Sequence, residues 1–88
     1  MAKENGDVQK VVESALIPML QALVDKPEAV RVETLSTSNK TLVVNISVDK
    51  SDTGKIIGKS GRHADALRTL VKAIAASYSC RAVVEIGE

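Results

Sequence analysis

The hydrophobic period changes along the chain, and the order of these changes constrains the fold more than any other feature. Residues 8–24 repeat apolar side chains at the three- and four-residue spacing of a helix. Residues 30–37 and 41–48 instead alternate apolar with polar side chains and are rich in β-branched residues, which predicts two strands. Helical spacing returns over residues 62–78, and alternation returns over residues 81–86. The chain is therefore predicted to be an α+β protein.

Short segments separate these runs and determine how the elements connect. Ser38 to Lys40 lies between the two β runs and predicts a hairpin. Ser51 or Asp52 is suited to cap a short helical turn that runs to Ile57. The order is thus α-β-β-α-α-β, and a helical crossover makes the last strand parallel to one of the first two. We expect a three-stranded mixed sheet with three helices on one face.

The first helix has a predicted start and a predicted defect. Asp7 is placed to cap its N-terminus, so residues 1–7 are expected to be a flexible tail and residues 8–88 one domain. Pro18 lies in the middle of the helical run, where proline lacks an N–H and clashes with the preceding turn. We therefore expect a kink or a break near residues 14–17. The apolar stripe of the last helix is predicted to comprise Ala64, Leu67, Leu70, Val71, Ile74 and Tyr78.

Composition excludes several classes of protein. Cys80 is the only cysteine, which excludes an internal disulfide and a cysteine-rich zinc site, and we expect no metal and no cofactor. No run has membrane-spanning length and no segment resembles a signal peptide, so a soluble cytoplasmic protein is expected. Tyr78 is the only aromatic residue, so modules that stack bases on exposed rings are poor candidates.

The basic charge of the chain is concentrated around one glycine-rich stretch. The net charge is only +1, but residues 50–72 hold six basic residues against two acidic ones. Within them lies TGKIIGKSGRH, residues 53–63, which has the composition of a phosphate-holding loop. A nucleotide-binding Walker A loop needs four residues between its glycines, whereas Gly54 and Gly58 enclose three. An 88-residue chain also lacks room for the parallel sheet of such enzymes, so we discard that interpretation.

The alternative unit is Gly58-Lys59-Ser60-Gly61, a G-x-x-G turn between two helices. Glycines at both ends allow a sharp turn and the close approach of a phosphate, and the next helix offers its N-terminal N–H groups. Lys59 is expected to contact phosphate, with Lys55 and Arg62 beside it. Ile56 and Ile57 precede the turn, where they can serve as one core anchor and one apolar wall for bases. Nothing in the chain resembles a catalytic constellation, so no enzyme is expected.

Residues 52–76, DTGKIIGKSGRHADALRTLVKAIAA, resemble the signature of a KH domain, and the element order resembles its type II arrangement. From about residue 8 to residue 86 the chain is similar to the small bacterial single-KH-domain proteins of the KhpA type. The resemblance implies one KH domain that binds single-stranded RNA through the loop and an aliphatic groove beginning at the two isoleucines. The expected RNA-binding residues are Lys55, Ile56, Ile57, Gly58, Lys59, Ser60, Gly61 and Arg62.

The resemblance also implies partners and a role. It implies a homodimer, or a heterodimer with a larger Jag-type KH protein, because one groove reads few bases and two grooves bind more tightly. The corresponding role is that of a post-transcriptional regulator or RNA chaperone. The competing hypothesis is a protein-interaction or scaffold module, in which the KH fold persists without significant RNA binding.

Overall fold

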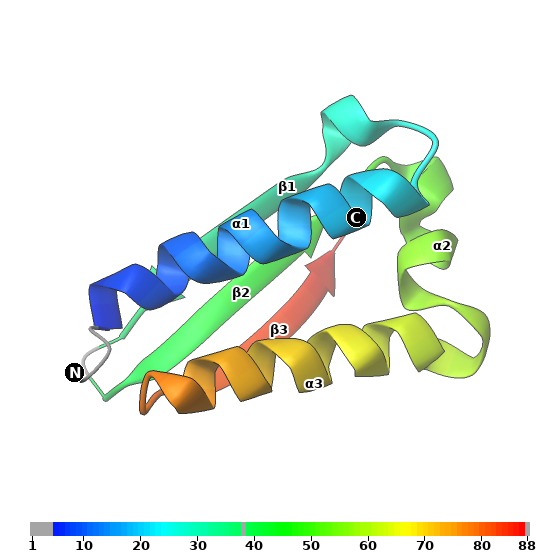
Figure 1. The fold of residues 1–88 in the computed structure, drawn as a ribbon. Coiled ribbons are helices and arrows are strands. Elements are labelled where there is room, and N and C mark those ends of the chain that lie inside the picture. Colours follow the sequence, from blue (N-terminus) through cyan, green and yellow to red (C-terminus); the bar gives the residue numbers. More distant parts are fainter. Residues whose placement is uncertain (1–4, 38, 88) are drawn as a thin grey trace.

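The computed structural model describes residues 5–37 and 39–87, and the predicted order of elements is confirmed (Figure 1). The helices are α1 (Asn5–Leu23), α2 (Thr53–Ile57) and α3 (Arg62–Ser77). The strands are β1 (Arg31–Ser36), β2 (Thr41–Ser47) and β3 (Arg81–Gly87). Short 3-10 turns, η1 (Pro27–Ala29), η2 (Lys50–Asp52) and η3 (Lys59–Gly61), occupy three of the connections.

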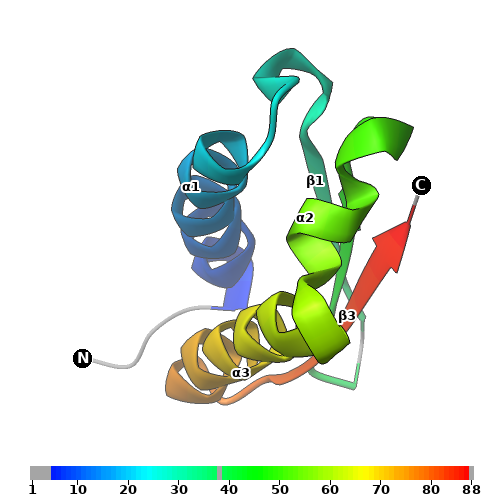
Figure 2. The same cartoon turned by 90° about the vertical axis from the view of Figure 1, so that its right-hand side faces the viewer.

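The sheet has β2 at its centre. β1 pairs with β2 antiparallel and β3 pairs with β2 parallel, so the last strand has the predicted direction. All three helices lie on one face of the sheet, with α1 and α3 side by side across it and α2 at one end (Figures 1 and 2). The fold is therefore the α+β arrangement of a mixed sheet with one covered face.

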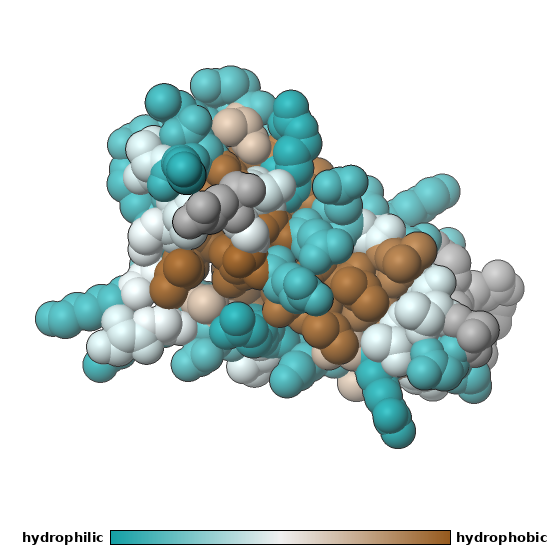
Figure 3. All heavy atoms as spheres, turned by 180° about the vertical axis from the view of Figure 1, so that it is seen from behind, coloured by the Kyte–Doolittle hydropathy of each residue, from teal (hydrophilic) through white to brown (hydrophobic). Residues whose placement is uncertain are grey.

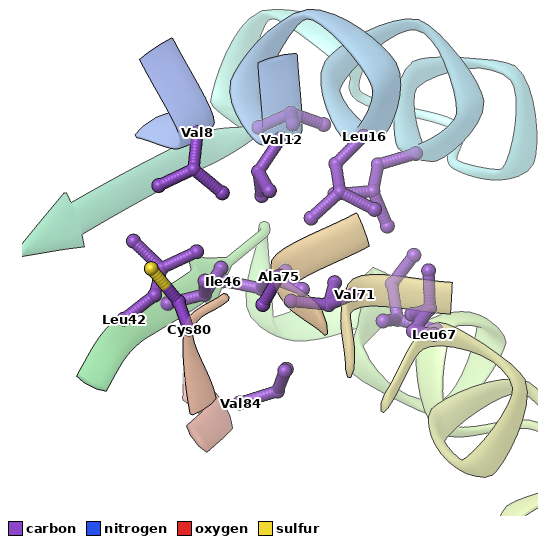
Figure 4. Packing of buried hydrophobic residues seen from close by; sticks show 14 of the residues in the cluster. Val8, Val12, Leu16, Leu42, Ile46, Leu67, Val71, Ala75, Cys80 and Val84 are labelled. Carbon is purple, nitrogen blue, oxygen red and sulfur yellow. The ribbon is translucent and has the colours of Figure 1, made fainter. Parts of the chain in front are cut away.

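The core lies between this covered face and the helices. Apolar residues of β2 and β3 face each other across the parallel pair, as Leu42 with Ala82 and Val44 with Val84. α1 and α3 add side chains at helical spacing above them (Figure 4). The core residues that α1 and α3 contribute are Val8, Val12, Leu16, Leu20, Leu67, Val71 and Ala75. The hydrophobic periods of the sequence thus correctly predict both sides of the core.

Three expectations about the helices need correction. α1 begins at Asn5, so Asp7 lies inside its first turn, while residues 1–4 of the predicted tail fall outside the described residues. The predicted break at Pro18 is absent, because α1 continues through it. Pro18 and Ser14 are both exposed, so water can reach the Ser14 carbonyl that proline leaves without a partner. Leu70, predicted in the apolar stripe, is 46% exposed.

The other face of the sheet is open and carries hydrophobic side chains (Figure 3). The strand register places Leu35, Val43 and Val83 in one row across the three strands. The next row holds Glu33, Asn45 and Glu85, so acidic side chains border the apolar row. Within the described part of the chain, no helix combines the length and apolarity needed to cross a membrane.

Candidate nucleic-acid interface

α2 holds the start of the glycine loop against the core through one isoleucine. Ile56 is fully buried in the core cluster, whereas the neighbouring Ile57 is 39% exposed. The side chains of consecutive helical residues diverge by about 100°, so only one of the pair can face the core. Ile57 is therefore available as an apolar wall beside the loop. Ile56 is fully buried and is the one of the pair that takes the expected role of core anchor.

The GKSG loop, residues 58–61, turns sharply because three of its four residues have positive φ angles. Gly58 has φ 75° and ψ 170°, and Gly61 has φ 75° and ψ 14°. The N–H of Gly58 closes α2 by donating to the Gly54 carbonyl at 2.8 Å, and the N–H of Gly61 donates to the Gly58 carbonyl at 3.1 Å. The loop joins α2 to α3 at the end of the helical layer (Figure 1). The predicted helix–turn–helix unit is confirmed as local geometry.

Ser60 adopts a backbone conformation that serine rarely takes. Its φ of 57° and ψ of 25° are those of the left-handed helical region. For a residue with a Cβ, this region costs about 1–2 kcal/mol relative to the right-handed one. Such conformations cluster at binding sites, where the surroundings keep them in place. The loop is therefore held in a specific, unfavourable shape.

The cations of the stretch differ in how they are paired. Lys59 and Arg62 are exposed, and neither forms an ion pair with any described residue. Lys55 hydrogen bonds to the Asp25 carboxylate, and its Nζ lies 3.6 Å from Oδ1 of Asp52. The hydrogen bond to Asp25 and both negative charges raise the pKa of Lys55 above its ordinary value, against the smaller effect of burial. Lys55 is thus a partly neutralised cation, while Lys59 and Arg62 are free to meet an anion.

Asp52 is a buried carboxylate that the sequence suggests only as a possible helix cap. Its oxygens accept hydrogen bonds from the backbone N–H groups of Asp25, at 3.1 Å, and Lys26, at 3.0 Å. Burial raises the pKa of Asp52, but these two bonds and the Lys55 ammonium outweigh it, so that pKa lies below its ordinary value. The cap of η2 is Asp49, which accepts from the N–H of Ser51 at 3.0 Å. Asp52 is the N-cap residue of α2, the helix that ends at Ile57, as the sequence allows, but its side chain forms no cap hydrogen bond there.

His63, in the first turn of α3, contacts the loop that precedes it. Its Nδ1 lies 2.7 Å from the carbonyl oxygen of Lys55, on the far side of the loop. A lone histidine near a glycine loop gives no sequence signal for such a contact. Among the described residues, no group of three or more His, Cys, Asp or Glu side chains is placed to hold a metal ion.

This mixed sheet and this G-x-x-G turn between α2 and α3 define a KH domain of the type II arrangement. Residues 13–86 match the family described as KhpA/KhpB, KH domain. The chain belongs to this family, which confirms the resemblance inferred from the sequence.

Relatives from several bacteria share most of the chain. A protein of Caldanaerobacter subterraneus subsp. tengcongensis is 46% identical over 66 residues, covering 75% of this chain and 87% of the relative. A Bacillus subtilis protein is 41% identical over 75 residues, covering 85% and 91%. A Chlamydia pneumoniae protein is 41% identical over 70 residues, covering 80% and 88%. All three are named RNA-binding protein KhpA, and none is named as an enzyme. No solved structure matches the chain.

Proposed function

We propose that this protein binds single-stranded RNA through the GKSG loop. The observation that carries the proposal is a pair of exposed cations, Lys59 and Arg62, on a loop whose backbone turns sharply. Neither has a carboxylate partner among residues 5–37 and 39–87. The loop leads into α3, whose N-terminus has no side-chain cap and presents the positive end of the helix dipole. A backbone phosphate would be held by these charges and N–H groups. The names of the relatives support the choice of RNA.

Bases would lie against aliphatic side chains next to the loop. Ile57 offers an exposed apolar surface immediately before Gly58. Ile86 of β3 is half-buried and pairs in register with Ile46, near the end of the sheet from which the chain enters α2. Contacts of this kind discriminate weakly between bases, and one KH groove holds about four nucleotides. We therefore propose low sequence selectivity for one copy of the chain.

A double substitution tests the loop directly. Lys59→Asp combined with Ser60→Asp places two anions where the phosphate would lie, and we expect it to abolish binding of a labelled single-stranded RNA of about 12 nucleotides. The matched control is Lys10→Asp combined with Ser14→Asp, which makes the same change of charge at exposed positions of α1. The control is expected to retain most of the affinity. Circular dichroism establishes that both variants are folded.

Two results would contradict the proposal. If the loop variant and the wild type bind equally, the GKSG loop is not the contact surface. If the wild type fails to bind RNA even at low salt, where phosphate contacts are strongest, the scaffold interpretation replaces RNA binding.

We further propose that the protein acts in the cytoplasm as a post-transcriptional regulator or RNA chaperone, paired with a second KH domain. A single domain with a local basic patch binds RNA weakly, and a second linked groove raises the effective concentration. The pairing is either with another copy of this chain or with a Jag-type KH protein. The link between pairing and RNA binding is tested by titrating a labelled RNA with the wild-type protein at concentrations below and above its dimer dissociation constant. The affinity for RNA should be higher where the protein is dimeric.

The helical layer offers a surface for this pairing. α1 carries an apolar stripe at four-residue spacing, Val11, Ala15, Met19 and Leu23. Glu13 lies on the opposite flank of α1, where its carboxylate accepts a hydrogen bond from the Thr34 hydroxyl of β1. The apolar stripe therefore lies on the flank of α1 that faces α3. α3 adds the exposed Leu70. Exposed apolar side chains grouped on one layer are typical of protein interaction sites.

A further inference from the structure

His63 connects the two ends of the GKSG loop. Its ring belongs to α3, and its Nδ1 lies 2.7 Å from the carbonyl oxygen of Lys55 in α2. A carbonyl oxygen only accepts hydrogen bonds, so Nδ1 must carry the proton and donate it. The bond gives a partner to one of the last carbonyls of α2, which have none within the helix. A single side chain therefore joins the helix before the loop to the helix after it.

The same ring also packs against the first glycine of the loop. A Cβ placed on Gly58 would lie 2.6 Å from Cγ and 2.8 Å from Nδ1 of His63. The imidazole thus occupies the space that a side chain at residue 58 would need. In contrast, a Cβ on Gly61, which has the same φ of 75°, would meet no atom within 4 Å. Of the two loop glycines, only Gly58 is held by a neighbouring side chain.

The contacts of His63 with Lys55 and Gly58, called the clamp below, have an effect because of the elements around the loop. α2 has five residues and is too short to be stable by itself. Ser60 is in the left-handed region, which a free loop would leave for more favourable conformations. A bond from Lys55 to His63 closes the chain around the loop and restricts these alternatives.

We propose that His63 is a positioning residue for RNA binding, which fixes the GKSG loop through its Nδ1–H bond to Lys55 and its packing on Gly58. This inference rests on the proposed RNA-binding function. It assigns His63 no contact with RNA. Its effect is that Lys59 and Arg62 already occupy their binding positions in the free protein, so that less conformational freedom is lost when RNA binds.

Two amide substitutions separate the role of Nδ1 from that of the rest of the ring. His63→Asn places an N–H donor where Nδ1 lies, whereas His63→Gln places it one bond further, where Nε2 lies. We expect the Gln variant to bind a labelled single-stranded RNA of about 12 nucleotides roughly fivefold more weakly, and the Asn variant to stay within about twofold of the wild type. Because His63 is exposed, both variants are expected to unfold at nearly the wild-type temperature.

A measurement without RNA keeps this inference separate from the proposed function. His63 is the only histidine, so the nitrogen signals of one imidazole are seen by long-range ¹⁵N–¹H NMR of the wild type. In the neutral form of the imidazole we expect the proton on Nδ1. The amide hydrogen of Gly61, which is bonded to the Gly58 carbonyl, should exchange faster in the Gln variant than in the Asn variant.

The outcomes lead to different conclusions. A proton on Nε2 in the wild type overturns the clamp whatever the RNA data show. Equal RNA affinity of the Gln variant and the wild type overturns the positioning role even if the bond exists. If the wild type binds no RNA but the proton lies on Nδ1 and Gly61 exchanges as expected, the clamp stands and the proposed function fails.

Discussion

The carboxylate of Asp52 accepts a hydrogen bond from the backbone N–H of Lys26 at 3.0 Å, although 26 residues separate them in the chain. The N–H of the adjacent Asp25 donates to the other carboxylate oxygen at 3.1 Å. Both N–H groups follow the end of α1, and Asp52 directly precedes α2. Asp52 therefore ties the α1–β1 connection to the helix that leads into the GKSG loop. The orientation of α2, and with it that of the loop, depends on this buried group.

Asp52→Asn should destabilise the protein clearly. An asparagine side chain offers one acceptor oxygen, and its NH₂ would face a backbone N–H, leaving that partly buried donor without a protein partner. We expect the midpoint of thermal unfolding, followed by circular dichroism at neutral pH, to fall by roughly 5–15 °C. The control is Asp65→Asn, whose side chain is 77% exposed and which should change the midpoint by no more than about 2 °C. Equal midpoints for the two variants would show that the tie contributes little.

The same carboxylate should make stability depend on acid pH. Burial raises the pKa of Asp52, but its hydrogen bonds from Asp25 and Lys26 and the Lys55 charge bring that pKa below its ordinary value. The folded state therefore binds fewer protons than the unfolded state, whose aspartates titrate near 3.9. This contribution to stability is present above that pH and is lost as the pH falls through the folded-state pKa.

Urea unfolding of the wild type between about pH 6 and pH 3 should thus show a falling free energy of unfolding. The decline should be shallower in Asp52→Asn. It should not vanish, because the bonds from Ser51 also lower the pKa of Asp49. Parallel declines in the two proteins would contradict the assignment to Asp52.

The pairing of Lys55 predicts an order of importance among the cations. Lys59→Met and Arg62→Met should each weaken RNA binding and reduce the slope of log affinity against log salt by about 0.7, the value for one phosphate contact on a single strand. Lys55→Met should leave that slope nearly unchanged, because Asp25 and Asp52 already engage its charge. Fluorescence anisotropy titrations at several salt concentrations measure all three. If Lys55→Met also lowered the slope by about 0.7, Lys55 would have to contact a phosphate of the RNA.

The sequence predicts the element order, the sheet direction and the site of the turn because these depend on local period and spacing. Leu42 and Val44 alternate toward the core, and the glycines at 58 and 61 mark the turn, before any tertiary contact is known. The buried role of Asp52 could not be predicted, because its partners are backbone groups 26 and 27 residues away. The pairing of Lys55 could not be predicted for the same reason, since its carboxylate partners include Asp25, 30 residues away.

Pro18 and Leu70 show a second limit of the sequence. A proline within a helical run predicts a break only if its surroundings do not tolerate the missing bond, and here the affected turn faces solvent. Leu70 fits the helical period of α3 but lies at the edge of the stripe, where packing decides between burial and exposure. Whether each position faces solvent or the core, which the period alone does not encode, decided both cases.

The two loop glycines should respond differently to alanine. Gly61→Ala places a Cβ in open space at φ 75°, so it should cost about 1 kcal/mol of stability through the left-handed backbone alone. Gly58→Ala should cost more, about 2–3 kcal/mol, because φ 75° with ψ 170° is a region that essentially only glycine adopts and because the new Cβ would lie 2.6 Å from the His63 ring. Urea unfolding compares the two. A larger loss for Gly61→Ala would mean that neither the backbone region of Gly58 nor the His63 ring restricts residue 58 as described.

Self-association should depend on the helical layer rather than on the open face of the sheet. Leu70 of α3 and Val83 of β3 are each 46% exposed, so replacing either with lysine removes a similar apolar surface and adds the same charge. We expect Leu70→Lys to raise the dimer dissociation constant at least about tenfold in sedimentation equilibrium, because a charge in an apolar contact is left without solvation. Val83→Lys should have little effect, since Glu33 and Glu85 already border its row with charge. If Val83→Lys raised the dissociation constant more than Leu70→Lys, the interface would lie on the sheet instead. If the wild type were monomeric, pairing with another KH protein would be the remaining route to a second groove.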